Sequence, residues 1–197
     1  MTLSNKITKE LAIDFPIIMA PMFLVSNEAM MKSGIDAGIM ATFPSLNYRR
    51  EGELERLLKT LNNYKSAGQS KGNYGVNLIV QQSNPLYKKH LEICIENKVP
   101  FFITSLGNPK EVIDKAHSYG AKVYCDVTNL VHAAKCASLN CDGFIAVGQG
   151  AGGHAGRRRD GGLVRAIPQA GAGLAAGAGR AGLRGLCRRD GAVTLCR

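Results

Sequence analysis

Short apolar segments alternate with amphipathic segments along most of this chain, and this alternation restricts the fold more than any other feature. We predict strands at residues 16–22, 38–43, 74–80, 99–105, 121–127 and 142–148, and helices at 27–37, 51–67, 85–97, 109–119 and 130–139. Strands that are continuously apolar and separated by helices form a parallel sheet covered on both faces. Such a sheet is either doubly wound or closed into a barrel.

A glycine-rich loop, GQGAGGHAG, follows the sixth predicted strand at residues 148–156. A doubly wound dinucleotide-binding sheet carries its glycine-rich turn after the first strand, whereas that turn here is APMFLVSN, without a glycine. The order therefore favours a TIM-type (β/α)8 barrel, whose functional groups lie at the carboxyl ends of the strands. Glycines let backbone N–H groups approach a flat cofactor or a phosphate, and His154 can exchange a proton near neutral pH. The alternative is a flexible loop with an incidental exposed histidine.

The chain changes in composition after Gly156. Residues 157–197 hold nine Gly, eight Ala and nine Arg, and carry +7 of the formal net charge of +10. No β/α pair can be read there, because the glycine-rich centre lacks β-branched runs and a helical apolar stripe. We therefore divide the chain into a barrel portion at 1–156, apparently truncated after six β/α units, and a low-complexity tail at 157–197 that is disordered or translated out of frame. An open six-strand sheet would expose two edges and could self-associate.

The amino-terminal residues MTLSNKITKELAIDF place Lys and Glu where a secretory signal needs an apolar run, and no apolar stretch has the length of a membrane span. The six cysteines form no C-x-x-C pair and lie in apolar segments, as expected of reduced thiols that pack in a core. We expect a cytoplasmic protein without a membrane partner or a metal site.

Five segments, in order, carry a family resemblance: IIMAPM, GVNLIV, ITSLGNP, KVYCDVTN and DGFIAVGQGAGGHAG. Together, from about residue 13 to residue 156, they resemble the nitronate monooxygenase family, formerly called 2-nitropropane dioxygenases. The A-G-G-H-x-G loop at this distance from its strand is specific to that group of flavoenzymes. The resemblance implies a TIM barrel that binds FMN and oxidises alkyl nitronates with dioxygen to a carbonyl compound and nitrite. The implied partners are a nitronate or nitroalkane and dioxygen, and no nucleic acid.

The resemblance also assigns site residues. His154 matches the catalytic histidine, which takes the α-proton from a neutral nitroalkane or orients the anionic nitronate. The matching cofactor-binding residues are Ala20, Pro21, Met22, Asn77, Lys122, Val147, Gly148, Gly152 and Gly153. Asn77 is supported independently, because an amide inside an apolar strand buried on both faces must find polar partners.

Other readings of single residues are simpler. Met22 could be ordinary core packing, and Lys122 could be solvated at the edge of its strand. We interpret Cys125 as packing, because a thiol nucleophile needs a paired base and His132 lies about two helical turns further on.

The tail departs from the family pattern. Family members continue with strands that end in A-A-G-G-I and G-T-R-F and hold the FMN phosphate, and neither motif is present here. We therefore expect weakened flavin binding and impaired activity. One alternative function is an FMN-dependent enoyl-acyl-carrier-protein reductase, which would consume NAD(P)H. Another is an inactive scaffold whose Arg-rich tail binds nucleic acid.

Overall fold

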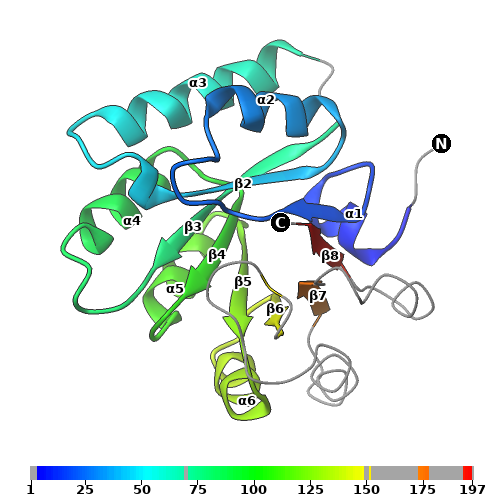
Figure 1. The fold of residues 1–197 in the computed structure, drawn as a ribbon, viewed down its shortest axis with the longest axis vertical. Helices are drawn as coiled ribbons and strands as arrows, with labels where there is room; N and C mark the ends of the chain where they lie inside the picture. Colours follow the sequence, from blue (N-terminus) through cyan, green and yellow to red (C-terminus); the bar gives the residue numbers. More distant parts are fainter. Residues whose placement is uncertain (1–3, 69–70, 149–150, 152–172, 178–192, 197) are drawn as a thin grey trace.

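The computed structural model describes residues 4–68, 71–148, 151, 173–177 and 193–196. Eight parallel strands form a closed barrel in the order β1 to β8, and helices α2 to α6 lie outside it (Figure 1). The strands are β1 (Ile17–Met19), β2 (Met40–Pro44), β3 (Asn73–Ile79), β4 (Phe101–Ser105), β5 (Lys122–Val127), β6 (Gly143–Val147), β7 (Gly173–Gly177) and β8 (Val193–Cys196). The helices are α1 (Lys6–Leu11), α2 (Glu28–Asp36), the short 3-10 helix η1 (Ser45–Asn47), α3 (Glu53–Ala67), α4 (Tyr87–Glu96), α5 (Lys110–His117) and α6 (Leu130–Ser138).

The six β/α units predicted from the sequence are confirmed, and β7 and β8 add to them. β7 pairs with β6 from Gly143↔Gly173 onward, and β8 pairs with both β7 and β1. This pairing corrects the expectation that the sheet keeps two open edges. Backbone N–H and C=O groups make the ladder, so a segment such as GLAAG can pair although its side chains favour a strand weakly. The other tail residues lie outside the described part of the chain, and the division at Gly156 stays a prediction.

Two apolar clusters form the core, one on each side of the barrel wall. The outer cluster packs the helices against outward-facing strand residues such as Phe43, Phe102 and Phe144. The inner cluster fills the barrel with residues such as Met40, Phe101 and Tyr124. This separation follows from strand geometry, since successive side chains point to opposite faces.

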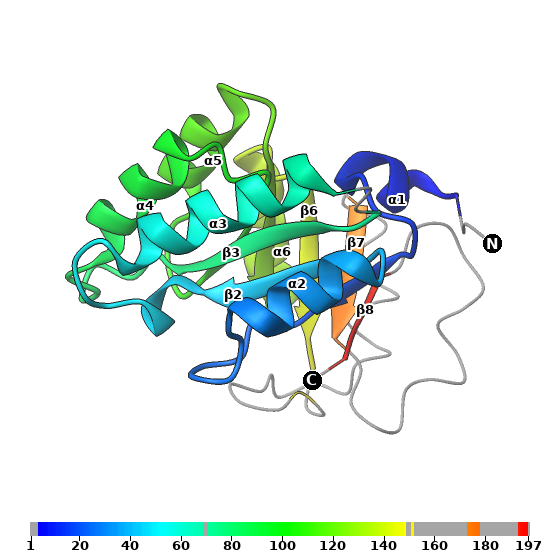
Figure 2. The same cartoon turned by 90° about the horizontal axis from the view of Figure 1, so that it is seen from above.

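Helix α1 closes the amino-terminal end of the barrel. Its Ile7 and Leu11 are buried and belong to the same cluster as the residues that fill the barrel. Figure 2 shows α1 at the end of the barrel opposite the carboxyl ends of β6 and β8. The open end is therefore the carboxyl end. Within the described residues, no helix combines the length and apolar character required to cross a bilayer.

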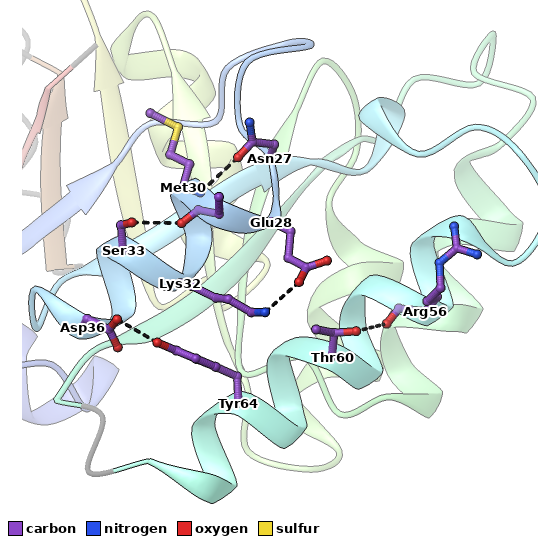
Figure 3. Close-up of polar contacts among 10 residues, drawn as sticks. Asn27, Glu28, Met30, Lys32, Ser33, Asp36, Arg56, Thr60 and Tyr64 are labelled. Atoms are coloured by element: carbon purple, nitrogen blue, oxygen red, sulfur yellow. Dashed lines mark hydrogen bonds and ion pairs between the residues drawn. The ribbon is translucent and has the colours of Figure 1, made fainter.

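Exposed polar contacts link α2 and α3 on the outer surface. The Tyr64 hydroxyl donates a hydrogen bond to Asp36 at 2.7 Å, and Lys32 pairs with Glu28 at 2.7 Å (Figure 3). The Lys32 ammonium also lies 5.2 Å from the centre of the Tyr64 ring. The Asn27 side chain caps α2 by accepting from the amide of Met30. The Tyr64–Asp36 hydrogen bond and the contact of Lys32 with the Tyr64 ring therefore join α2 to α3 on the outer surface of the barrel.

A partly buried carboxylate, Asp142, joins three elements at the amino end of the barrel. Asp142 accepts hydrogen bonds from Lys122 Nζ at 2.9 Å and from the Val123 amide at 2.8 Å, and its carboxylate pairs with His117 Nε2 at 2.7 Å. Burial alone raises the pKa of Asp142, but the hydrogen bonds from Lys122, Val123 and His117 together outweigh it and leave the pKa below its usual value.

We expect Asp142→Asn to lower the free energy of unfolding at pH 7 by about 1–3 kcal/mol, because it leaves Lys122 without its charged partner. The folded-state pKa of Asp142 is depressed, so its contribution is present above the ordinary aspartate value of about 3.9 and is lost as the pH falls through the folded value. Denaturant unfolding at pH 7 and pH 3 should therefore show a smaller difference between wild type and variant at pH 3.

Asp114→Asn is the matched control, because Asp114 pairs with Lys110 at an exposed site and such pairs contribute about 0–1 kcal/mol. An equal difference between wild type and Asp142→Asn at both pH values would contradict the assignment.

Candidate active site

A cavity of about 910 Å³ opens at the carboxyl-terminal ends of the strands. Its described lining comes from the loop after β1, the junction of β2 and η1, the ends of β3 to β6, the loop before α5, and one face of α6. This volume lies within the range of about 300–1,000 Å³ typical of small-molecule sites. Because the strands are parallel, their carboxyl ends converge at this single opening.

One wall of the cavity is apolar. Pro21, Met22 and Phe23 follow β1, and Leu46 lies in η1 next to them, where the Asn47 side chain binds the carbonyl of Met22 and the amide of Leu24. These hydrogen bonds fix the loop after β1 on the turn after β2. Val147, at the end of β6, contributes to the same lining. Such a surface suits a flat, weakly polar ring.

A chain of hydrogen bonds crosses three neighbouring strands, β3 to β5, in the cavity lining. Asn77 of β3 donates from Nδ2 to Ser105 Oγ at 2.8 Å, and Ser105 of β4 donates to Asp126 Oδ2 of β5 at 2.6 Å. All three side chains line the cavity. Parallel pairing places the three residues side by side. Asn77 is in register with Ile103, two residues before Ser105 on β4. Thr104 is in register with Cys125, so Ser105 and Asp126 each lie one residue further along their strands.

The direction of this chain is fixed by a backbone carbonyl. Asn77 Nδ2 also donates to the Ile103 carbonyl at 3.2 Å, and because a carbonyl can only accept, the nitrogen of the amide must face Ile103 and Ser105. Ser105 Oγ accepts this hydrogen bond from Asn77 and donates its own hydroxyl hydrogen to Asp126 Oδ2. Asp126 Oδ2 is therefore held as an acceptor.

Helix α6 brings positive and titratable groups to the rim. Thr128, His132 and Lys135 all line the cavity, and Thr128 Oγ1 lies 3.5 Å from His132 Nδ1. Thr128 lies just before α6, and the spacing of four and then three residues places His132 and Lys135 on the face of the helix that follows it. Sequence reasoning gave His132 no function, although a helix face that follows the end of a barrel strand is a recognisable signal.

The structure brings together part of the predicted cofactor site. Four of the predicted residues line the cavity: Pro21, Met22, Asn77 and Val147. Ala20 is buried in the inner cluster directly before them, and Gly148 is buried directly after β6. Gly152, Gly153 and His154 lie outside the described residues. Ser105 and Asp126 were not predicted as site residues.

Lys122 lies away from this group. It begins β5 at the amino end of the barrel, where it pairs with Asp142, while Asp126 on the same strand reaches the cavity. Four residues of strand separate the two positions by roughly 13 Å. The hydrogen bond with Asp142 raises the pKa of Lys122 and keeps the ammonium charged. Its position supports a structural ion pair, so we do not retain it as a cofactor contact.

Two cysteines of the cavity lining, Cys125 and Cys136, are buried thiols. Contact with Cys136 by itself lowers the pKa of Cys125, but contact with Cys141 and burial outweigh it and raise the pKa to about 12. Thr104 Oγ1 also donates to Cys125 Sγ at 3.3 Å. Cys125 is therefore protonated at neutral pH, which supports the interpretation as packing. Among the described residues, no three His, Cys, Asp or Glu side chains are placed to hold a metal ion.

The described lining fits the ring portion of a flavin. The apolar wall offers a flat surface, and Asn77 presents a fixed amide whose nitrogen is already occupied by Ile103 and Ser105. Its oxygen is then the atom left to receive an N–H from a bound ring. The family resemblance expects the last two strands to hold the phosphate, and the residues that follow β7 and β8 lie outside the described part of the chain.

Solved structures share this fold at low sequence identity. FabK from Thermotoga maritima is 24% identical, with a TM-score of 0.80 over 98% of this chain and 62% of that one. A mutant of the same protein gives a TM-score of 0.81 over 98% of this chain and 65% of that one, again at 24% identity. Nitroalkane oxidase from Streptomyces ansochromogenes is 19% identical, with a TM-score of 0.72 over 87% of this chain and 60% of that one. The chain thus spans less than two thirds of the length of these proteins.

No curated protein sequence matches the chain. The family model for nitronate monooxygenase matches residues 51–176, which is more than half of the sequence. The match begins at the start of the α3 region, includes the strands that carry Asn77, Ser105 and Asp126, and runs past Gly156 into β7. The chain therefore belongs to the nitronate monooxygenase family.

Proposed function

We propose that the chain binds FMN at the carboxyl end of the barrel and oxidises alkyl nitronates with dioxygen to a carbonyl compound and nitrite. The observation that carries this proposal is the cavity itself, whose lining combines apolar side chains with the fixed amide of Asn77. Membership of the nitronate monooxygenase family supports the reaction class. FMN, when bound, supplies the electron-transfer chemistry, and the chain supplies position and electrostatics.

The described residues then have separate tasks. Pro21, Met22 and Val147 exclude water and support one face of the ring. Asn77 orients the ring edge through its amide oxygen, and this orientation requires no rearrangement because the amide nitrogen is already bonded. Lys135 places a positive charge at the rim, which attracts an anionic nitronate toward the opening.

The predicted glycine-rich loop completes the proposal. His154 is the proposed catalytic residue, which orients the anionic nitronate or takes the α-proton of a neutral nitroalkane, and the backbones of Gly148, Gly152 and Gly153 approach the cofactor. Of these residues, Gly148 is buried at the end of β6 next to the cavity residue Val147.

Asn77→Ala should weaken FMN binding about tenfold, because it removes a hydrogen bond whose net value is about 1–1.5 kcal/mol. Titration of the apoprotein with FMN, followed by the quenching of flavin fluorescence, measures the change. Asn97→Ala is the control, since Asn97 caps the outer helix α4 and binds only the Ile93 carbonyl with its side chain. Equal affinities of the Asn77→Ala variant and the wild type would contradict the assignment of Asn77.

The reaction itself is tested with purified full-length protein, FMN and ethyl nitronate. We expect nitrite release from ethyl nitronate coupled to oxygen consumption. With the neutral nitroethane as substrate, we expect a loss of about 100-fold or more in kcat/KM for His154→Gln, the range for removal of a group that takes a proton. His117→Gln is the control, because His117 pairs with Asp142 at the amino end of the barrel. Protein that binds FMN and releases no nitrite would refute the proposed reaction.

A second function follows from the likeness to FabK, which covers nearly all of this chain. An FMN-dependent enoyl-acyl-carrier-protein reductase would oxidise NAD(P)H in the presence of an enoyl thioester. The same preparation distinguishes the two reactions, since only the reductase consumes NAD(P)H at a rate that depends on the thioester.

A further inference from the structure

Apolar side chains follow the carboxyl ends of four consecutive strands at the mouth of the cavity. They are Phe23 after β1, Leu46 after β2, Ile79 at the end of β3 and Leu106 after β4, and we call them the apolar rim. All four line the cavity and keep part of their surface exposed, about half of it in Phe23 and Leu106. Because β1 to β4 are neighbours in the barrel, these residues follow one another along one side of the opening.

The loop after β1 turns its polar groups inward and its apolar side chains outward. Ser26 is buried, and its hydroxyl accepts a hydrogen bond from the Met22 amide at 3.0 Å. The Asn47 side chain donates to the carbonyls of both residues. Between these bonded ends, the side chains at 23–25 (Phe-Leu-Val) are each more than half exposed. Contiguous exposed apolar side chains on such a bonded loop are typical of a binding surface.

Two leucines at the mouth adopt a left-handed backbone conformation. The φ angles of Leu24 and Leu106 are 60° and 58°. The other described non-glycine residues with positive φ are Ala12, Lys98 and Asn140, which lie one or two residues after helices α1, α4 and α6, where this conformation is common. A leucine in this conformation is strained, whereas glycine or asparagine would relieve the strain. The chain thus keeps large apolar side chains at these two positions against the preference of the backbone.

Both leucines are held in place by the backbone around them. The Leu24 amide donates to Asn47 Oδ1 at 2.9 Å. After β4, a Cβ atom at Gly107 would come within 2.7 Å of the Val80 carbonyl oxygen, so glycine lets this loop lie against the end of β3. The apolar rim is therefore ordered before a ligand arrives, which lowers the entropic cost of binding.

The mouth changes in character after β5. The residues that line it there, Thr128, His132 and Lys135, are polar or charged, and they come from the start and one face of α6. A molecule with an anionic head and an apolar chain therefore meets a cation on one part of the mouth and the apolar rim on another.

We infer that the apolar rim binds the alkyl chain of the substrate, so that the preferred substrates are nitronates whose unbranched chains are long enough to reach out of the cavity. This inference rests on the proposed function and narrows it from alkyl nitronates in general to the longer members. The occupant is a chain attached to the reacting head group, because Phe23 and Leu106 belong both to the cavity lining and to the exposed surface.

The test is kcat/KM for nitrite release from ethyl, butyl, hexyl and octyl nitronate with the full-length FMN-loaded protein. Burial of one methylene contributes about fourfold, so a surface that covers half of each methylene should contribute about twofold. Hexyl nitronate should therefore exceed ethyl nitronate by roughly tenfold.

Variants of the apolar rim should flatten this series. Leu106→Asn and Phe23→Ser should each bring the hexyl-to-ethyl ratio of kcat/KM toward one, because they replace an apolar contact of the chain with a polar group. Asparagine accepts the left-handed backbone at position 106, so Leu106→Asn should keep the free energy of unfolding. Val131→Thr is the matched control and should keep the full ratio, since Val131 is exposed on α6 but is not among the described residues that line the cavity.

Unreactive alcohols separate the apolar rim from the reaction. Butanol, hexanol and octanol should bind the same protein with affinities that rise about twofold per methylene, measured by isothermal titration calorimetry, and Leu106→Asn should remove the rise. This pattern in a protein that releases no nitrite would refute the proposed oxidation and support the binding of alkyl chains.

Three results would overturn the inference while the oxidation stands. The first is a flat nitronate series in an active wild type, and the second is a series whose slope persists in both Leu106→Asn and Phe23→Ser. The third is a flat series together with self-association that Leu106→Asn abolishes, since the apolar rim would then be a contact between copies of the chain.

Discussion

Backbone pairing between β8 and β1 closes the barrel, so that the carboxyl ends of its strands surround one opening. Ile17, Ile18 and Met19 pair in register with Thr194, Leu195 and Cys196, so the first and last strands are bonded neighbours. Closure of parallel strands places all carboxyl ends around one opening. Asn77, Ser105 and Asp126 meet there because their strands are adjacent and in register, although they are far apart in the sequence.

The two ends of the barrel have different chemistry. Helix α1 packs into the amino end of the barrel, and Asp142 links neighbouring elements there through hydrogen bonds. The carboxyl end contains the cavity. Lys122 and Asp126 illustrate the contrast, since they share one strand and one face yet lie at opposite ends of it. One makes an ion pair that stabilises the fold, and the other lies at the site proposed for chemistry.

Sequence periodicity predicted the strands and outer helices of the first six units well, because strands buried on both faces and amphipathic helices leave clear local patterns. It missed β7, whose GLAAG sequence has little strand preference, and β8, whose β-branched Val193 and Thr194 stand at the end of a low-complexity segment. Helix α1 was missed too, although Asn5 and Thr8 form a capping box at its start.

The site was predictable only in part. Family resemblance identified Pro21, Met22, Asn77 and Val147, which line the cavity. Resemblance also pointed to Lys122, but the residue's place at the start of its strand puts it at the other end of the barrel. Ser105 and Asp126 carry no local pattern of their own, since their significance arises from register between strands.

The Asp142 contacts have a consequence for where this chain can accept substitutions. They join α5, β5 and the entry to β6 at the amino end, at the opposite end of the barrel from the cavity. Substitutions at the cavity therefore do not disturb the ionic tie, and changes in the tie need not reshape the cavity. Substitutions that alter the chemistry of the cavity can therefore accumulate at the carboxyl end of the barrel, while the contacts that stabilise the fold are kept at the amino end.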